Sequence, residues 1–154
     1  MLKEHYYFAY GSNMNSQRMI DRGLEFSQAL AGQMHGYQLA FNKKAWDHPC
    51  RSYANVVVSR CSENSVVEGV LYKLNDHQQI FKMDPFEGAP RLYSRDIYLI
   101  ETLEGKIPAW VYIANKATLA EGLKPDQWYL DHLLAGKPYL SESYYQRLTQ
   151  VAVN

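Results

Sequence analysis

Short apolar and aromatic runs alternate with polar turns along most of the chain, and this pattern predicts more strands than helices. Residues 6–9 are apolar or aromatic throughout, which is typical of a central strand. Further strands are expected over residues 26–41, with an interruption at Gly32 or Gly36, and over 54–59, 66–74, 93–102 and 109–113. Two pairs of these strands are joined by turn residues. We therefore expect one hairpin from 54–59 and 66–74, through a turn at 61–65, and a second from 93–102 and 109–113, through Glu104-Gly105-Lys106.

Four segments have helical spacing and helix-ending residues. They cover residues 15–22, closed by Gly23; a segment that starts at Asn75-Asp76 and meets Pro85; 126–135, ended by Gly136; and 142–151. The buried positions are expected to be Met19 and Ile20 in the first helix, and Ile80, Phe81 and Met83 in the second. Hairpin strands combined with a first strand that leads into a helix imply an α+β fold with a mixed sheet that curls into a barrel.

Length and charge narrow the classes of function. The 154 residues suffice for one compact domain covering 1–154, and 47% hydrophobic with 21% charged residues is ordinary for a globular protein. Sixteen basic residues balance sixteen acidic ones, which argues against nucleic acid or an anionic membrane as partner. Cys50 and Cys61 lack metal-ligand spacing, and the N-terminal residues do not resemble a signal peptide, so we expect a cytoplasmic protein. The oligomeric state is not indicated.

The stretch from Tyr7 to Met14 is a candidate binding loop. A strand stops abruptly at Gly11-Ser12-Asn13, where glycine allows close approach of a ligand and the amide N–H groups of a helix start favour an anion. Serine and asparagine also cap helices, and the local pattern by itself favours that simpler role. Ser12 is a weak candidate nucleophile because the Gly-x-Ser-x-Gly signature is absent.

Glu87 is the candidate acid–base residue. It is expected just past the end of a helix, among apolar neighbours such as Phe86 and Leu92, where burial would raise its pKa and suit it to proton transfer. A lone glutamate is more commonly a solvated surface residue. The five histidines show no metal-binding spacing, so no metal site is expected. A polar segment over residues 42–52 is either a plain connector or a loop that folds over a site.

Two stretches together resemble the γ-glutamylcyclotransferase family. They are Tyr7-Phe8-Ala9-Tyr10-Gly11-Ser12-Asn13-Met14 and Met83-Asp84-Pro85-Phe86-Glu87-Gly88-Ala89-Pro90-Arg91-Leu92-Tyr93-Ser94-Arg95. Between them, Tyr53-Ala54-Asn55-Val56 and Glu68-Gly69-Val70-Leu71-Tyr72 are similar to the two strands that the family has there. Order and spacing agree across nearly the whole chain.

The resemblance implies a small mixed β-barrel with flanking helices. It also implies a cofactor-independent, metal-free enzyme that releases an amino acid or amine from a γ-glutamyl compound while the glutamyl part closes to 5-oxoproline. It implies Glu87 as the catalytic residue. The residues implied to contact the substrate are Tyr7, Phe8, Ala9, Tyr10, Gly11, Ser12, Asn13, Tyr93 and Tyr145, with Tyr144 as the alternative to Tyr145. The sequence leaves open whether the leaving group is an amino acid, an amine, glutathione-derived or a biosynthetic intermediate. A binding module that senses a glutamyl-like metabolite without turnover is the alternative function.

Overall fold

The computed structural model describes residues 5–59 and 65–154. The strands are β1 (Tyr6–Ala9), β2 (Phe26–His35), β3 (Tyr37–Lys44), β4 (Ser52–Val58), β5 (Val66–Leu74), β6 (Tyr93–Thr102) and β7 (Gly105–Ala114). The helices are α1 (Ser16–Asp21), α2 (Gln79–Glu87), α3 (Gln127–Leu134) and α4 (Glu142–Thr149), with short 3-10 turns η1 (Ser12–Met14), η2 (Lys116–Thr118) and η3 (Lys137–Tyr139).

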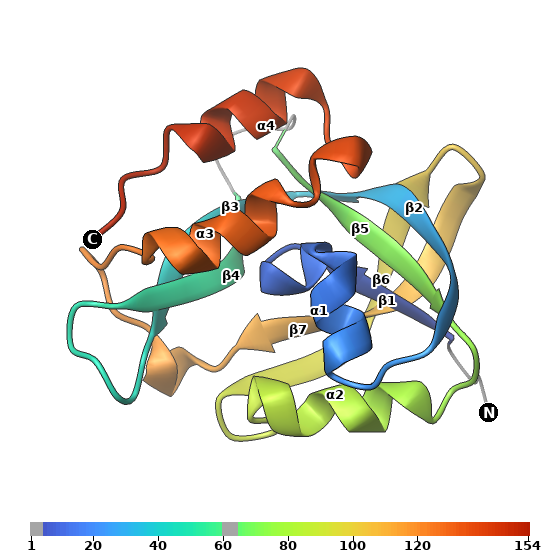
Figure 1. Ribbon diagram of the computed structural model, residues 1–154, viewed down its shortest axis with the longest axis horizontal. Coiled ribbons are helices and arrows are strands. Elements are labelled where there is room, and N and C mark those ends of the chain that lie inside the picture. The colour runs from blue at the N-terminus through green and yellow to red at the C-terminus, as the bar shows by residue number, and fades with distance from the viewer. Residues whose placement is uncertain (1–4, 60–64) are drawn as a thin grey trace.

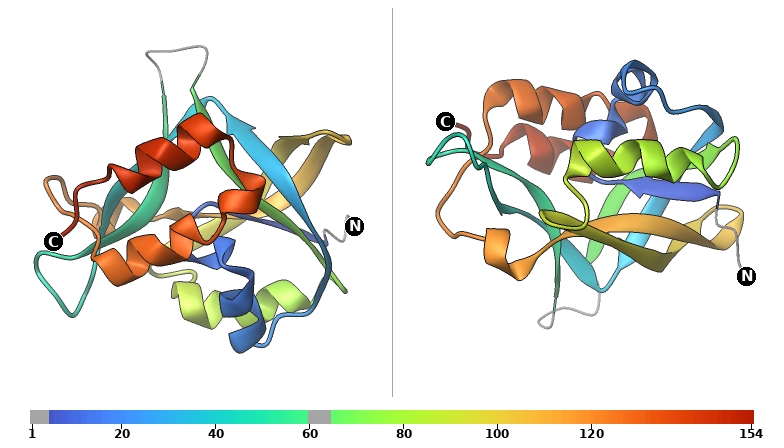
Figure 2. Two further views of the ribbon diagram at one scale, coloured as in Figure 1. Left: turned by 45° about the horizontal axis from the view of Figure 1, so that its top comes forward. Right: turned by 90° about the horizontal axis from the view of Figure 1, so that it is seen from below.

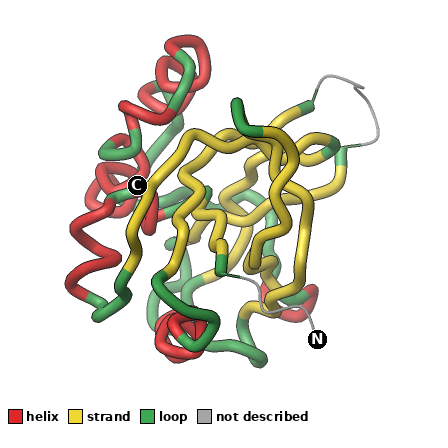
Figure 3. Tube along the Cα trace, turned by 90° about the vertical axis from the view of Figure 1, so that its right-hand side faces the viewer, coloured by secondary structure: helices red, strands yellow, loops and turns green. Residues whose placement is uncertain are grey.

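Five strands form a closed barrel in the order β1-β5-β2-β6-β7, as the α+β prediction anticipated. Neighbouring strands are antiparallel except β1 and β7, which are parallel where Tyr7 pairs with Trp110. The curl of the strands is seen in Figure 3, with the helices outside them. The barrel interior is filled by fully buried side chains, among them Phe8, Leu71 and Ile100. This packed interior holds the end of β1, and hence the loop that follows it, in a fixed place.

Strands β3 and β4 form a separate antiparallel pair beside the barrel, which we call the β3–β4 ribbon (Figure 1). The expected hairpin between β4 and β5 is wrong, because both edges of β5 are occupied by β1 and β2. The chain leaves the barrel at Gly36, whose φ of +84° turns it away from β2, and β3 then pairs with β4 instead. The predicted turn at 61–65 lies almost entirely outside the described residues. The ribbon is tied to the barrel by Asn55, whose buried side-chain Oδ1 accepts a hydrogen bond from the Ala114 amide at 2.9 Å.

Helix α2 runs two residues past Pro85, which was expected to resist continuation of the helix. Proline lacks an N–H donor and its ring crowds the carbonyl four residues earlier, so the helix continues for only two more residues. The helix ends instead at Gly88, in the left-handed conformation at φ +64°, where the amide donates to the carbonyls of Asp84 and Pro85. Glu87 is therefore the last residue of α2, rather than a residue beyond it.

Helices α3 and α4 lie together on one side of the barrel, and α2 lies on another (Figures 1 and 2). Their predicted extents are close to those observed, since Asp126 and Ser141 stand at the N-caps. In α1 and α2 the inward positions Met19, Ile80 and Met83 are buried as expected, whereas Ile20 and Phe81 are 55% and 58% exposed. Both exceptions are on short helices, where one residue of helical rotation moves a side chain from the core to solvent.

Candidate active site

The loop after β1 forms the first part of the site. The carbonyl of Gly11 accepts a hydrogen bond from the Met14 amide at 3.0 Å, which makes a 3-10 turn of η1. The amides of Ser12 and Asn13 precede Met14, whose N–H makes the first hydrogen bond of the turn. They therefore occupy the position in which N–H groups at a helix start have no partner inside the helix. The Tyr72 hydroxyl from β5 donates to the Asn13 carbonyl at 2.6 Å and fixes the loop to the barrel.

Asn13 joins this loop to Glu87. Its side-chain amide Nδ2 lies 3.1 Å from Glu87 Oε1 and 2.9 Å from the Tyr7 hydroxyl, so its two hydrogens have two oxygen acceptors. Its carbonyl Oδ1 accepts from Arg22 Nη1 at 3.1 Å. The residue is 2% exposed. One buried side chain thus sets the position of the candidate acid relative to the loop, across 74 residues of sequence.

Burial raises the pKa of the Glu87 carboxyl above its ordinary value. The positive charges of Arg22 and Arg18, the Asn13 hydrogen bond and the charge of Lys43 act in the opposite direction. A carboxyl whose pKa is raised gives up and takes back a proton nearer to neutral pH, which suits general acid–base chemistry.

These groups line one cavity of about 240 Å³, equal to roughly eight water molecules of the liquid, which suits a small molecule. The side chains and backbone lining it are those of Tyr7, Phe8, Tyr10, Gly11, Ser12, Asn13, Arg18, Arg22, Lys43, Trp46, Tyr53, Ala54, Phe86, Glu87, Leu92, Tyr93, Tyr112, Trp128 and Tyr129. Burial raises the pKa of the Tyr7, Tyr10 and Tyr93 hydroxyls well above the usual value. These tyrosines therefore stay neutral. Tyr10 and Tyr93 donate their single hydroxyl hydrogen to backbone carbonyls, whereas the Tyr7 hydroxyl accepts from Asn13 and keeps its hydrogen for a ligand.

The backbone of Ala54, on the β3–β4 ribbon, is hydrogen-bonded to two tyrosines of the cavity, Tyr93 and Tyr129. Its carbonyl accepts from the Tyr93 hydroxyl at 2.9 Å, and its amide donates to the Tyr129 hydroxyl at 3.0 Å. Tyr129 comes from α3 and Tyr93 from the start of β6. A Cβ at Gly11 would lie 3.1 Å from the Tyr129 hydroxyl, so the loop, the ribbon and α3 meet closely here.

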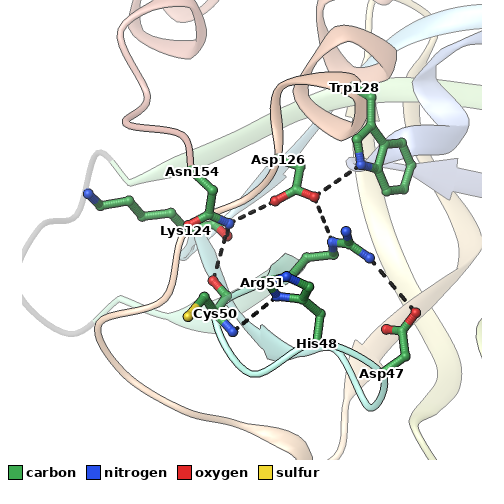
Figure 4. A network of polar contacts seen from close by, with 8 residues as sticks. All are labelled: Asp47, His48, Cys50, Arg51, Lys124, Asp126, Trp128 and Asn154. Carbon is green, nitrogen blue, oxygen red and sulfur yellow. Dashed lines mark hydrogen bonds and ion pairs between the residues drawn. The ribbon is translucent and has the colours of Figure 1, made fainter.

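The outer edge of the cavity carries two exposed tryptophans, Trp46 at 86% and Trp128 at 45%. A polar network fixes the segments that bear them (Figure 4). Arg51 Nε lies 2.6 Å from Asp126 Oδ2, and the Trp128 indole donates to the same oxygen at 3.2 Å. Asn154 donates to Asp126 Oδ1 at 2.8 Å. The segment over 42–52 therefore does reach the cavity, through Lys43 and Trp46.

Most of the residues expected from sequence converge on this cavity. Tyr7, Phe8, Tyr10, Gly11, Ser12, Asn13, Glu87 and Tyr93 all line it, whereas Ala9 is buried in the core and does not. Tyr145 lies elsewhere, on α4 beside a separate pocket, with Lys137 Nζ 4.9 Å from its ring centroid. Tyr144 is buried, and its hydroxyl has no hydrogen-bond partner among residues 5–59 and 65–154. The structure therefore brings neither α4 tyrosine to the cavity.

Several lining residues were missed by the sequence reading. Arg18 and Arg22 are four apart on the helix that follows the loop, and that spacing places both on one helix face, a signal that could have found them. Lys43, Tyr53 and Tyr129 carry no local signal, since only the tertiary structure brings them to the cavity.

Ser12 does not have the surroundings of an activated nucleophile. Its hydroxyl accepts a hydrogen bond from Arg18 Nε at 3.1 Å, and a guanidinium cannot act as a base. Within residues 5–59 and 65–154, no cluster of three histidine, cysteine, aspartate or glutamate side chains could hold a metal ion. None of the helices described there is both long and apolar enough to cross a membrane.

Comparison with known proteins identifies the family of this chain. Residues 7–131 match the sequence profile of the family described as "Gamma-glutamyl cyclotransferase, AIG2-like". The chain belongs to this family. The match includes both the loop and Glu87, the two parts of the site that the Asn13 side chain joins.

Solved structures share the γ-glutamylcyclotransferase fold. The chain is similar to an uncharacterized human protein and to a structure described as "Gamma-glutamyl cyclotransferase", each with a TM-score of 0.80, 22% identity, and coverage of 97% of this chain and 89% of the other. It is also similar to a yeast γ-glutamyl cyclotransferase described as specific to glutathione, with a TM-score of 0.67, 13% identity, and coverage of 94% and 93%. No curated protein matches the sequence.

Proposed function

We propose that this protein is a γ-glutamylcyclotransferase in which the α-amine of a γ-glutamyl substrate attacks its own γ-carbonyl. The products are 5-oxoproline and a free amino acid or amine. The observation that carries the proposal is the Asn13–Glu87 contact at 3.1 Å, which sets a partly buried carboxyl with a raised pKa beside the loop after β1, in one cavity. An intramolecular attack needs a proton acceptor and an anion site, and the cavity offers both.

Glu87 is the proposed proton carrier. It takes a proton from the substrate ammonium, which frees the amine lone pair for attack, and then gives that proton to the departing nitrogen as its bond to the carbonyl carbon breaks. The attacking nitrogen loses a second proton when it becomes the ring amide, and the departing amine takes up a second proton to leave as an ammonium, so the proton count balances within one turnover. Such acid–base catalysis contributes about 10²–10⁴-fold in rate.

The loop and the neighbouring cations are proposed to hold the negative charges of the glutamyl part. The amides of Ser12 and Asn13 can donate to the α-carboxylate or to the oxyanion that forms at the γ-carbonyl, where one donor is worth about 10²–10³-fold elsewhere. Arg18 and Arg22 also line the cavity, each bonded to a loop residue, and leave further N–H donors for the α-carboxylate.

The enzyme does not need a nucleophile of its own, because the attacking amine is already tethered to the carbonyl. For a well-held conformer the effective molarity of such a closure can reach ~10⁵ M or more. We accordingly propose a small-molecule γ-glutamyl substrate, no metal or organic cofactor, and a cytoplasmic location, the last on the cysteine usage noted above.

The test is a panel of γ-glutamyl dipeptides, γ-glutamylamines and glutathione incubated with the purified protein, followed by chromatographic detection of 5-oxoproline. We expect product from at least one member. Glu87→Gln is expected to lower kcat by about 100-fold or more. Glu104→Gln, an exposed turn residue of the same type, is the matched control and should keep full activity.

Two outcomes would contradict the proposal. Absence of 5-oxoproline from every substrate, with thermal stabilisation by a γ-glutamyl compound, would favour a binding module instead. Product formation at an unchanged rate in Glu87→Gln would remove Glu87 from its role. Ser12→Ala should retain activity, since the hydroxyl is not the attacking group.

A further inference from the structure

Lys43 is a buried cation that has no role in the proposed reaction. It is 2% exposed, and it is one of the residues that line the active-site cavity. Its hydrogen-bond partner is the backbone carbonyl of Lys44 at 2.7 Å, and the ring centroids of Tyr53 and Tyr93 lie 5.8 and 5.7 Å from Nζ. Among residues 5–59 and 65–154 it forms no ion pair.

A buried ammonium without a carboxylate partner is unfavourable, and burial accordingly lowers the pKa of Lys43. The Glu87 charge is near enough to favour its charged form, but that carboxyl is bonded to Asn13. A ligand anion arriving at Lys43 would supply the missing partner. The site is therefore built to receive a negative charge.

The charged residues that line the cavity indicate which negative group of the substrate would pair with Lys43. Three cations, Arg18, Arg22 and Lys43, line it together with one carboxylate, Glu87. The α-carboxylate of the glutamyl part is bonded to the same carbon as the reacting amine, so it lies near Glu87 and within reach of the loop and the α1 arginines. Lys43 enters from the β3–β4 ribbon, a different element, and remains unmatched.

We propose that Lys43 selects substrates whose leaving group carries a carboxylate, by pairing with that carboxylate. The inference rests on the proposed cyclotransferase function. It makes Lys43 the residue that distinguishes γ-glutamyl amino acids and peptides from γ-glutamylamines. A leaving group with a second positive charge, such as a diamine, is disfavoured at the same place.

The experiment compares three substrates of nearly equal size. γ-Glutamyl-L-alanine has the carboxylate, γ-glutamyl-L-alaninamide replaces it with a neutral amide, and γ-glutamylethylamine lacks it. With the wild-type protein we expect kcat/KM for γ-glutamyl-L-alanine to exceed that for the alaninamide by about 10- to 100-fold, the range for a hydrogen bond to a charged group. γ-Glutamylethylamine should be no better than the alaninamide.

The second arm uses Lys43→Met, which keeps the length of the side chain and removes its charge. The ratio of the two kcat/KM values should fall toward 1. Removing the Lys43 charge also changes the pKa of Glu87, but that change affects all three substrates alike and cancels in the ratio. Lys44→Met, an exposed neighbour with the same charge change, should keep the wild-type ratio, and thermal unfolding checks that both variants are folded.

The outcomes separate the two proposals. Equal kcat/KM for the acid and the amide in the wild type, or an undiminished ratio in Lys43→Met, would overturn the role of Lys43 while leaving the cyclotransferase function in place. No 5-oxoproline from any γ-glutamyl compound would overturn the function, and the specificity with it.

Discussion

Removal of the Asn13 side chain tests whether this residue positions Glu87 for catalysis. Asn13→Ala deletes the donor to Glu87 Oε1 at 3.1 Å and the donor to the Tyr7 hydroxyl at 2.9 Å. It also leaves Arg22 Nη1 without the acceptor Oδ1. A hydrogen bond to a charged group is worth roughly 1.5–3 kcal/mol. If that energy holds the carboxyl in its reactive place, kcat/KM should fall by about 10- to 100-fold.

The pH profile of the same variant gives a second, independent readout. The Asn13 amide favours the charged form of Glu87 and lowers its pKa, so its loss raises that pKa further. Glu87 must be unprotonated to accept the first proton, and activity therefore falls as pH drops through its pKa. The acid limb of kcat/KM should move to higher pH in Asn13→Ala.

The assay is 5-oxoproline release across a pH series, with urea unfolding to separate activity from stability. Asn75→Ala, an exposed asparagine of the chain, is the control and should match the wild type in both. A lower urea midpoint with wild-type kcat/KM and an unmoved acid limb would refute the reasoning, because Asn13 would then be needed for folding alone.

Four further outcomes are expected. Because burial raises the folded-state pKa of Glu87, the contribution of this group to stability is present at low pH and is lost as pH rises through that pKa. Thermal unfolding should therefore show that Glu87→Gln is more stable than the wild type near pH 7. The difference in stability should close below the usual glutamate pKa. Arg51→Ala breaks the partly exposed pair with Asp126 and should raise KM about two- to fivefold in steady-state kinetics, whereas an unchanged KM would mean that the network does not shape the cavity edge. Tyr129→Phe leaves the buried Ala54 amide without its acceptor and should cost about 1–3 kcal/mol in urea unfolding. Tyr145→Phe, outside the cavity, should change activity little, and a large loss there would restore it as a substrate contact.

The parts of the fold that depend on neighbouring residues were predicted well. The β6–β7 hairpin follows from a Glu-Gly-Lys turn, and the last two helices follow from their helical spacing, with Gly136 ending the first of them. The failed β4–β5 hairpin depends on distant partners. Adjacent strands usually pair, but β1 and β2 occupy both edges of β5, and no local pattern in residues 54–74 reports that.

The same distinction between local sequence signals and distant partners applies to the residues of the candidate site. The loop and Glu87 were found because each is a contiguous motif, and their combination resembles a known family. Lys43 and Tyr129 were not found, because in the sequence each resembles an ordinary surface or core residue. Only the packing of the ribbon and of α3 beside the loop brings them to the cavity. Tyr145 was expected on the resemblance alone, and its helix packs elsewhere.

The separation of the β3–β4 ribbon from the barrel has a consequence for how such enzymes diversify. The groups proposed to carry the chemistry, Glu87 and the loop, are fixed by barrel strands and by α2, whereas Lys43 and Tyr53 belong to the ribbon. Changes in the ribbon can therefore accumulate without displacing the reacting groups, provided that the Ala54 and Asn55 contacts persist. Under the proposed function, substitutions in the ribbon would alter which amine departs, while the residues proposed for ring closure stay the same.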